Sequence, residues 1–198
     1  MIWITLIILA LVIWCIIGAR RIGTISNGSQ IPADATGRAL VIIDAQDCFL
    51  KKYDEAAVNA LGDEIKQAKF NGIPVIGLRH EWKHQPEALM MRVLDGGTGV
   101  SGTKGLQINA DLRVELDHTV DKFRQDGFHD GALDQLLRDL NVGHITIAGL
   151  DGNFCIQATA QAALNRGYSV KLSKSIFARA SDQWENTKAN LIALGAHT

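Results

Sequence analysis

Short apolar segments rich in β-branched residues alternate along most of this chain with segments of helical periodicity. Such short apolar runs are typical of strands buried on both faces, as in a parallel sheet. The expected strands are Ala39 to Asp44, Ile73 to Arg79, Thr119 to Phe123, His144 to Gly149 and Tyr168 to Ser173. The expected helices are Glu55 to Asn71, Phe128 to Leu140, Phe154 to Gly167 and Asp182 to Leu194. This alternation predicts an α/β fold, namely a three-layer α/β/α sandwich with a mainly parallel, Rossmann-like sheet.

The N-terminus carries a long uncharged run. Met1 to Gly18 has no charged side chain and as a helix would extend about 27 Å, enough to cross a bilayer. It lacks a basic start and a small-residue cleavage site, so we interpret residues 1–19 as a retained transmembrane anchor rather than a signal peptide. Arg20 and Arg21 follow the span, which predicts a cytoplasmic domain. A buried core helix is the alternative. Residues 20–38 are then a linker and residues 39–198 the folded domain.

Charge and cysteine content restrict the partners of the domain. Lys plus Arg number 20 and Asp plus Glu 21, so no net field attracts nucleic acid. Cys15 lies in the apolar run, and Cys48 and Cys155 alone are too few for a disulfide framework, which favours a reducing compartment. The glycine-rich residues 93–105 lack the order of a phosphate-binding loop and suggest a mobile flap or a loop packed at an interface. We expect a homo-oligomer without a cofactor.

Cys155 lies where the strand from His144 to Gly149 passes into a helix. Unpaired backbone N–H groups and the positive end of the helix dipole in a first helical turn favour a thiolate. They also supply donors for a developing oxyanion. The pattern therefore predicts a nucleophilic cysteine with a lowered pKa. The alternative is a small buried residue without chemistry.

Two further residues lie at or near the ends of expected strands. Asp44 ends one strand and Lys122 lies near the end of another, and the carboxyl ends of parallel strands share one edge of a sheet. An ammonium group can stabilise the thiolate of Cys155, and a carboxylate can take and return a proton. In isolation, Asp44 could equally be a helix N-cap or turn residue, and Lys122 a solvated surface lysine.

The segment HEWKH, residues 80–84, matches the H-E-x-x-H zinc pattern. A zinc peptidase needs both histidines on one helix with the glutamate between them. Here the motif leaves a strand and meets Pro86, so a zinc site built from His80, Glu81 and His84 remains the less favoured interpretation. Alternatively, His80 extends over the sheet edge beside Asp44 and contributes to a substrate pocket.

Four segments together resemble one known family. They are VIIDAQDCF (41–49), GTKGLQINADL (102–112), DKFRQDGF (121–128) and GLDGNFCIQATAQAALNRGY (149–168). From about Leu40 to Ala178 the chain resembles the isochorismatase-like cysteine hydrolases, a superfamily that includes nicotinamidases, N-carbamoylsarcosine amidases and ureidoacrylate amidases.

The resemblance implies a role for several residues. Asp44 would be the general base, Lys122 the stabiliser of the thiolate and transition state, and Cys155 the covalent nucleophile. The backbone N–H groups of Asp151 and Cys155 would form the oxyanion hole, after a cis peptide bond between Leu150 and Asp151. The residues expected to line the substrate pocket are Gln46, Phe49, His80 and Trp82.

The chain also departs from the family. Nicotinamidases bind a metal through a D-x-H-x-x-x-H pattern, but this chain has His80 and Trp82 where the aspartate and first histidine would be, so we expect no metal. We expect a membrane-anchored cysteine hydrolase that cleaves a small amide or ureide C–N bond through an acyl-enzyme. Asp151-Gly152-Asn153 is unusual for the family and favours the alternative, a non-catalytic binding or scaffold module.

Overall fold

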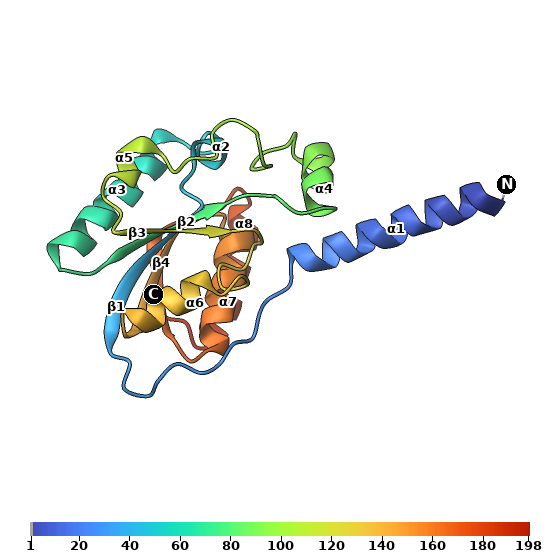
Figure 1. Ribbon diagram of the computed structural model, residues 1–198. Coiled ribbons are helices and arrows are strands. Elements are labelled where there is room, and N and C mark those ends of the chain that lie inside the picture. The colour runs from blue at the N-terminus through green and yellow to red at the C-terminus, as the bar shows by residue number, and fades with distance from the viewer. Residues whose placement is uncertain (1) are drawn as a thin grey trace.

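The computed structural model describes residues 2–198 and is built around a parallel five-stranded sheet in the order β3-β2-β1-β4-β5 (Figure 1). The strands are β1 (Gly37–Ile43), β2 (Val75–His80), β3 (His118–Lys122), β4 (Val142–Leu150) and β5 (Ser169–Phe177). The helices are α1 (Ile2–Ile22), α2 (Asp47–Leu50), α3 (Glu55–Phe70), α4 (Glu87–Leu94), α5 (Ala110–Arg113), α6 (Ala132–Asp139), the π-helical turn η1 (Gly152–Ile156), α7 (Gln157–Asn165) and α8 (Ser181–Ala193). The predicted α/β architecture is confirmed.

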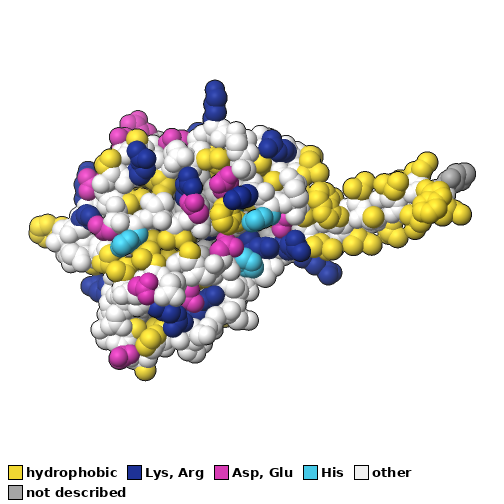
Figure 2. All heavy atoms as spheres, in the orientation of Figure 1, with side chains coloured by type: hydrophobic (Ala, Val, Ile, Leu, Met, Phe, Trp, Pro, Cys, Tyr) yellow, Lys and Arg dark blue, Asp and Glu magenta, His cyan; other side chains and the backbone are white. Residues whose placement is uncertain are grey.

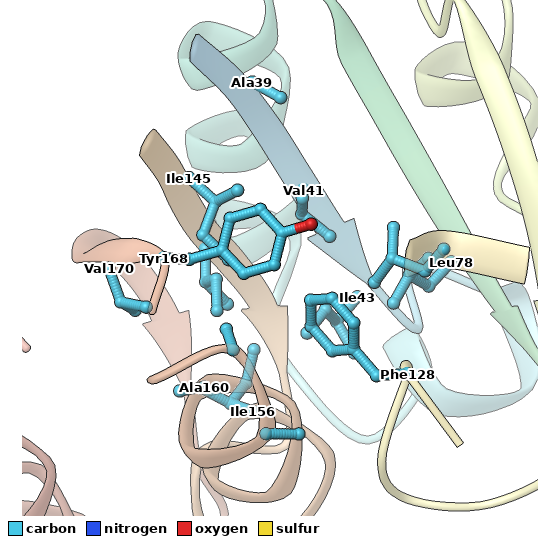
Figure 3. Packing of buried hydrophobic residues seen from close by; sticks show 14 of the residues in the cluster. Ala39, Val41, Ile43, Leu78, Phe128, Ile145, Ile156, Ala160, Tyr168 and Val170 are labelled. Carbon is cyan, nitrogen blue, oxygen red and sulfur yellow. The ribbon is translucent and has the colours of Figure 1, made fainter. Parts of the chain in front are cut away.

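The central strand β1 is covered on both faces. Its side chains alternate across the sheet, so Val41 and Ile43 pack in one cluster with residues of α6, α7 and α8. Figure 3 shows this cluster, in which Phe128 and Tyr168 fill the space over the strands. The intervening residues Leu40 and Ile42 pack against α3 and α5. Burial on both faces explains why the strand is a continuous apolar run.

Helix α1 projects from the domain (Figure 1). Most of its apolar side chains are exposed, Trp3 to 78% and Ile7 to 60%, so the helix does not belong to the core of the domain. Gly18 is its buried residue. A Cβ there would overlap Pro86 and come within 3.2 Å of the Met90 sulfur, because α1 packs against α4 at this point.

The segment expected as a linker is fixed to the domain. The Ser26 backbone N–H donates to the buried Asp126 carboxylate at 2.7 Å, and the buried Arg166 guanidinium donates to the Ser26 carbonyl at 3.1 Å and hydroxyl at 3.0 Å. Ile25 and Ile31 pack against the core. Sequence reasoning missed this attachment because these polar partners are 100 and 140 residues away along the chain.

The glycine-rich segment after α4 packs against the domain. Val100 forms an isolated backbone bridge with Trp82, and the Cys48 N–H donates to the Gly105 carbonyl at 2.9 Å. A Cβ at Gly99, where φ is +74°, would meet Phe49 and Trp82. The segment therefore lies directly against two residues expected to line the substrate pocket.

Candidate active site

The parallel sheet brings the candidate residues to one edge. Lys122 and His80 are register partners at the ends of β3 and β2, while Asp44 follows β1 and Cys155 follows β4 through η1. Since all of these strands run in the same direction, their ends share one crevice, as in other open α/β folds.

Lys122 is completely buried and fully hydrogen-bonded. Its Nζ lies 3.1 Å from Oδ1 and 3.2 Å from Oδ2 of Asp44. It also lies 3.2 Å from Nδ1 of His80 and donates to the Arg124 carbonyl at 3.2 Å. Burial alone would lower the pKa of Lys122, but the negative charge of Asp44 and the coupling to Cys155 outweigh burial and raise it. Lys122 is thus a buried cation.

Asp44 adopts an unusual backbone conformation. Its φ of +56° lies in the left-handed region, which an aspartate tolerates better than most residues and which is frequent at functional sites. Its N–H donates to the Leu78 carbonyl at 3.1 Å, and both oxygens of its carboxylate face the Lys122 ammonium. Burial raises the pKa of Asp44 despite the opposing charge of Lys122. The carboxyl group is therefore suited to hold a proton.

Cys155 is buried within η1, ahead of the regular helix α7. The Ile156 N–H donates to the Asp151 carbonyl at 3.2 Å, five residues back, which produces the π-helical turn. The expected lowered pKa is wrong: burial raises the pKa of Cys155, the Asp44 charge raises it further, and Lys122 opposes both. The resting thiol is protonated.

The expected cis bond between Leu150 and Asp151 is also wrong. Among residues 2–198, the cis peptide bond joins Gln85 to Pro86. A cis bond without proline costs about 3 to 4 kcal/mol, and Asp151 is instead held in extended backbone as the N-cap of η1. Its carboxylate accepts from the backbone N–H groups of Asn153 at 2.9 Å and Arg179 at 3.1 Å, and from the Tyr53 hydroxyl at 2.8 Å.

The unusual Asp151-Gly152-Asn153 segment has a structural explanation. Gly152 is required because a Cβ would lie 2.8 Å from the ring of Trp184. Asn153 donates to the Ala180 carbonyl at 2.9 Å and accepts from the Thr187 hydroxyl at 3.1 Å. These contacts connect the turn that carries the cysteine to α8, so the segment no longer favours a non-catalytic module.

His80 is a neutral, buried imidazole. Burial and then the adjacent Lys122 charge lower its pKa well below the ordinary 6.5. Its ring meets Trp82 edge-on, with centroids 4.2 Å apart. The Gln46 amide donates to the His80 carbonyl at 2.9 Å and the Leu106 carbonyl at 2.7 Å, and accepts from the His80 N–H. Gln46 thus holds the end of β2 and does not line the cavity described below, contrary to expectation.

The residues of the HEWKH segment do not fit a metal ion. His80 ends β2, and the next helix, α4, begins only at Glu87, so the two histidines do not lie on one helix. Nδ1 of His80 faces the Lys122 ammonium, and the His84 ring packs on Phe123. No group of three His, Cys, Asp or Glu side chains within residues 2–198 could hold a metal. The zinc peptidase interpretation therefore lacks its ligand set.

A cavity of about 320 Å³ opens onto this edge of the sheet. Asp44 and Cys155 lie in its wall, with three of the four expected pocket residues, Phe49, His80 and Trp82. The lining residues missed from sequence include Ile22, Tyr53, Met91, Leu94, Phe154 and Arg179. No local signal marks them, since they come from five separate elements or loops. A more open hollow of about 720 Å³ lies beside β3, and Asp44, Lys122 and Cys155 do not line it.

Comparison with known proteins gives a consistent result. An isochorismatase domain profile matches residues 38–197. The chain is 39% identical over 70 residues to the uncharacterized isochorismatase family protein YaaI of Bacillus subtilis, covering 35% of this chain and 39% of that protein. It is 27% identical over 143 residues to streptothricin hydrolase of Streptomyces noursei, covering 68% and 52%. The chain thus spans about half or less of these two relatives.

A crystal structure of a pyrazinamidase/nicotinamidase from Streptococcus mutans has the same fold. It matches with a TM-score of 0.70 at 22% sequence identity and covers 81% of this chain and 99% of that one. The family profile accounts for nearly the whole chain outside α1 and the segment that follows it. The chain therefore belongs to the isochorismatase family.

Proposed function

We propose that this protein is a cysteine hydrolase that cleaves the C–N bond of an amide or ureide through a covalent acyl-enzyme. The observation that carries the proposal is a buried Lys122–Asp44 ion pair at the same cavity edge as a buried cysteine. Burying two charges costs free energy of folding. Such a pair beside a nucleophile therefore indicates that the two residues serve catalysis rather than stability. One relative is named a streptothricin hydrolase and one structural neighbour a pyrazinamidase/nicotinamidase, which supports this class of reaction.

In the proposed first half-reaction, the Cys155 sulfur attacks the carbonyl carbon while Asp44 takes the thiol proton. The raised pKa of Asp44 supports this role, since a carboxylate with a raised pKa holds the transferred proton more readily. Lys122 stabilises the developing negative charge through its own charge. The backbone N–H groups of Asp151 and Cys155 are proposed to bind the oxyanion. The C–N bond then breaks, and the leaving nitrogen takes the proton from Asp44.

In the second half-reaction, a water molecule hydrolyses the thioester. Asp44 removes a proton from the water, the oxygen attacks the acyl carbon, and the C–S bond breaks. The Cys155 sulfur leaves as a thiolate beside Lys122 and recovers the proton from Asp44. The products are a carboxylic acid, or a carbamic acid for a ureide, and a free amine or ammonia. Every proton removed is returned, so no cofactor is needed in this scheme.

We further propose that α1 anchors the protein in a membrane with the domain on the cytoplasmic side. The helix is long and apolar enough to cross a bilayer, and Arg20 and Arg21 lie in its last turn. Homo-oligomer formation stays a prediction.

The direct test is ammonia release from a panel of small amides and ureides by the full chain in detergent micelles. We expect Cys155→Ala to reduce turnover at least about a thousandfold, as loss of a nucleophile does. Cys48→Ala is the matched control, because Cys48 is also buried and free but has no role in the scheme. Activity that survives in Cys155→Ala would contradict the proposal.

A further inference from the structure

We propose that the active site takes an amphiphilic amide from the bilayer, with the amide group at Cys155 and an apolar chain lying toward α1 and α4. This inference rests on the proposed function and names its substrate class. Helix α1 itself contributes to the cavity wall, because Ile22, its last residue, lines the cavity with Met91 and Leu94 of α4.

Several contacts attach the end of α1 to the domain. Gly18 packs against Pro86 and Met90 near the start of α4. The Arg124 guanidinium donates to the Arg21 carbonyl at 3.0 Å, just beyond the buried Lys122. Ser26 is then held by Asp126 and Arg166, as described above. These contacts place the end of α1 beside the cavity.

The apolar wall of the cavity continues onto the outer surface. Leu94 lines the cavity and is 73% exposed, and on the same helix Val93 and Leu89 are also exposed. Phe154, beside the nucleophile, lines the cavity and is 46% exposed. A protein in water rarely exposes such a set of large apolar side chains without a partner. Here the adjacent apolar helix α1 indicates the partner: the bilayer.

Basic residues surround this apolar surface, and Asp95, at the end of α4, pairs with Lys52 at 2.6 Å. Arg20 and Arg21 end α1, Arg92 lies on α4, and Arg124 contacts the end of α1. Figure 2 shows Lys and Arg side chains where the apolar helix joins the domain. A helix with apolar side chains beside basic residues is typical of the membrane interface. In Figure 1, α4 stands beside the domain end of α1 and its axis crosses that of α1, as a helix lying on the membrane surface would.

The chemistry follows from this placement. For a fatty primary amide, the Cys155 sulfur bonds to the carbonyl carbon, ammonia leaves with the proton held by Asp44, and water releases the fatty acid. The cavity of about 320 Å³ holds the amide group and the first part of the chain. The rest of the chain would extend between Leu94, Ile22 and the lipid.

The test uses the full chain in lipid nanodiscs with straight-chain primary amides from butanamide to dodecanamide, measured by ammonia release. We expect kcat/KM to rise at least about a hundredfold across the series, since each buried methylene contributes about a fourfold gain. Leu94→Gln should reduce the ratio of dodecanamide to butanamide kcat/KM at least about tenfold. Val114→Gln is the matched control, because Val114 is 75% exposed outside the cavity, and it should keep the wild-type ratio.

The outcomes separate the two proposals. If kcat/KM is flat or falls with chain length while short amides are still hydrolysed through Cys155, this inference is overturned and the proposed function stands. An equal loss of the ratio in Val114→Gln and Leu94→Gln also overturns the inference. If hydrolysis is absent, or persists in Cys155→Ala, the proposed function fails and the inference fails with it.

Discussion

Nζ of Lys122 lies 3.2 Å from Nδ1 of His80 in the interior of the protein. Since a lysine ammonium has only donors, Nδ1 accepts from Lys122 in the tautomer that carries the proton on Nε2, a buried atom with no hydrogen-bond partner within residues 2–198. With Asp44 and the Arg124 carbonyl, His80 therefore completes the three acceptors that the Lys122 ammonium requires. His80 is a positioning residue in this account, since it acts on the site through Lys122.

Replacing His80 should impair activity through Lys122. His80→Phe keeps a ring against Trp82 but leaves one N–H of a buried cation without an acceptor, which corresponds to a loss of about ten- to a hundredfold in kcat/KM. His80→Gln keeps an acceptor oxygen and should retain at least about a tenth of wild-type activity. Equal activity in His80→Phe and wild type, measured on any amide that the enzyme hydrolyses, would contradict the positioning role.

The neutral state of His80 predicts a pH dependence of stability. In the unfolded chain His80 gains a proton below about pH 6.5, whereas its folded pKa is well below that value. Above pH 6.5 this difference in pKa does not affect stability. As the pH falls from 6.5 toward the folded pKa, the free energy of unfolding decreases by up to about 1.4 kcal/mol per pH unit. Guanidinium unfolding in micelles between pH 7 and 5 should show a steeper loss for wild type than for His80→Gln. Parallel curves would argue against a buried neutral imidazole.

Thiol labelling tests the electrostatics of Cys155. Burial and then the Asp44 charge raise its pKa, while Lys122 lowers it. Asp44→Asn should therefore increase the iodoacetamide rate of Cys155 at pH 7 and abolish turnover, because it removes the opposing charge together with the base. Peptide mass spectrometry distinguishes Cys155 from Cys48, whose pKa is raised to about 11 by burial and then by the Asp44 charge. The labelling of each cysteine is therefore normalised to the same protein unfolded in guanidinium. Slower labelling of Cys155 in Asp44→Asn would be inconsistent with this arrangement.

The turn before Cys155 should be intolerant of a side chain. Gly152→Ala would place a Cβ 2.8 Å from the Trp184 ring and should destabilise the fold by about 1 to 3 kcal/mol, as overpacking does. Gly62→Ala in α3 is the control, since its Cβ would lie 3.7 Å from Leu112. Alanine is also favoured over glycine within a helix, so this variant should be neutral or stabilising in thermal unfolding. If both variants melt alike, the packing argument for Gly152 is wrong.

The sequence allowed the sheet to be predicted because burial on both faces makes parallel strands continuous apolar runs. The placement of Asp44 near Lys122 followed from one property of parallel sheets, that strand ends share an edge. The short helix α4 was not predicted, because Pro86 directly precedes it, a glycine-rich segment follows it, and its packing on α1 is not visible in the sequence.

Other features depended on surroundings that a sequence does not display. The direction of the Cys155 pKa shift was mispredicted. The sequence shows the helix start and Lys122, which lower the pKa, but it does not show the burial of the thiol, which raises it. Gln46 was expected to line the pocket, yet its amide donates hydrogen bonds to the backbone carbonyls of His80 and Leu106. The Asp151 carboxylate accepts from Tyr53 and Arg179, which lie far away along the chain, so these contacts were not predicted.

The proposed mechanism requires Cys155 to form a covalent acyl-enzyme. The most direct measurement is intact and peptide mass spectrometry of the full chain, quenched in acid within the first turnovers of an amide that it hydrolyses. We expect a transient gain of the acyl mass on the peptide that contains Cys155. This gain should be absent from Cys155→Ala and unchanged in Cys48→Ala. Acyl mass on another residue, or hydrolysis that continues in Cys155→Ala, would contradict it.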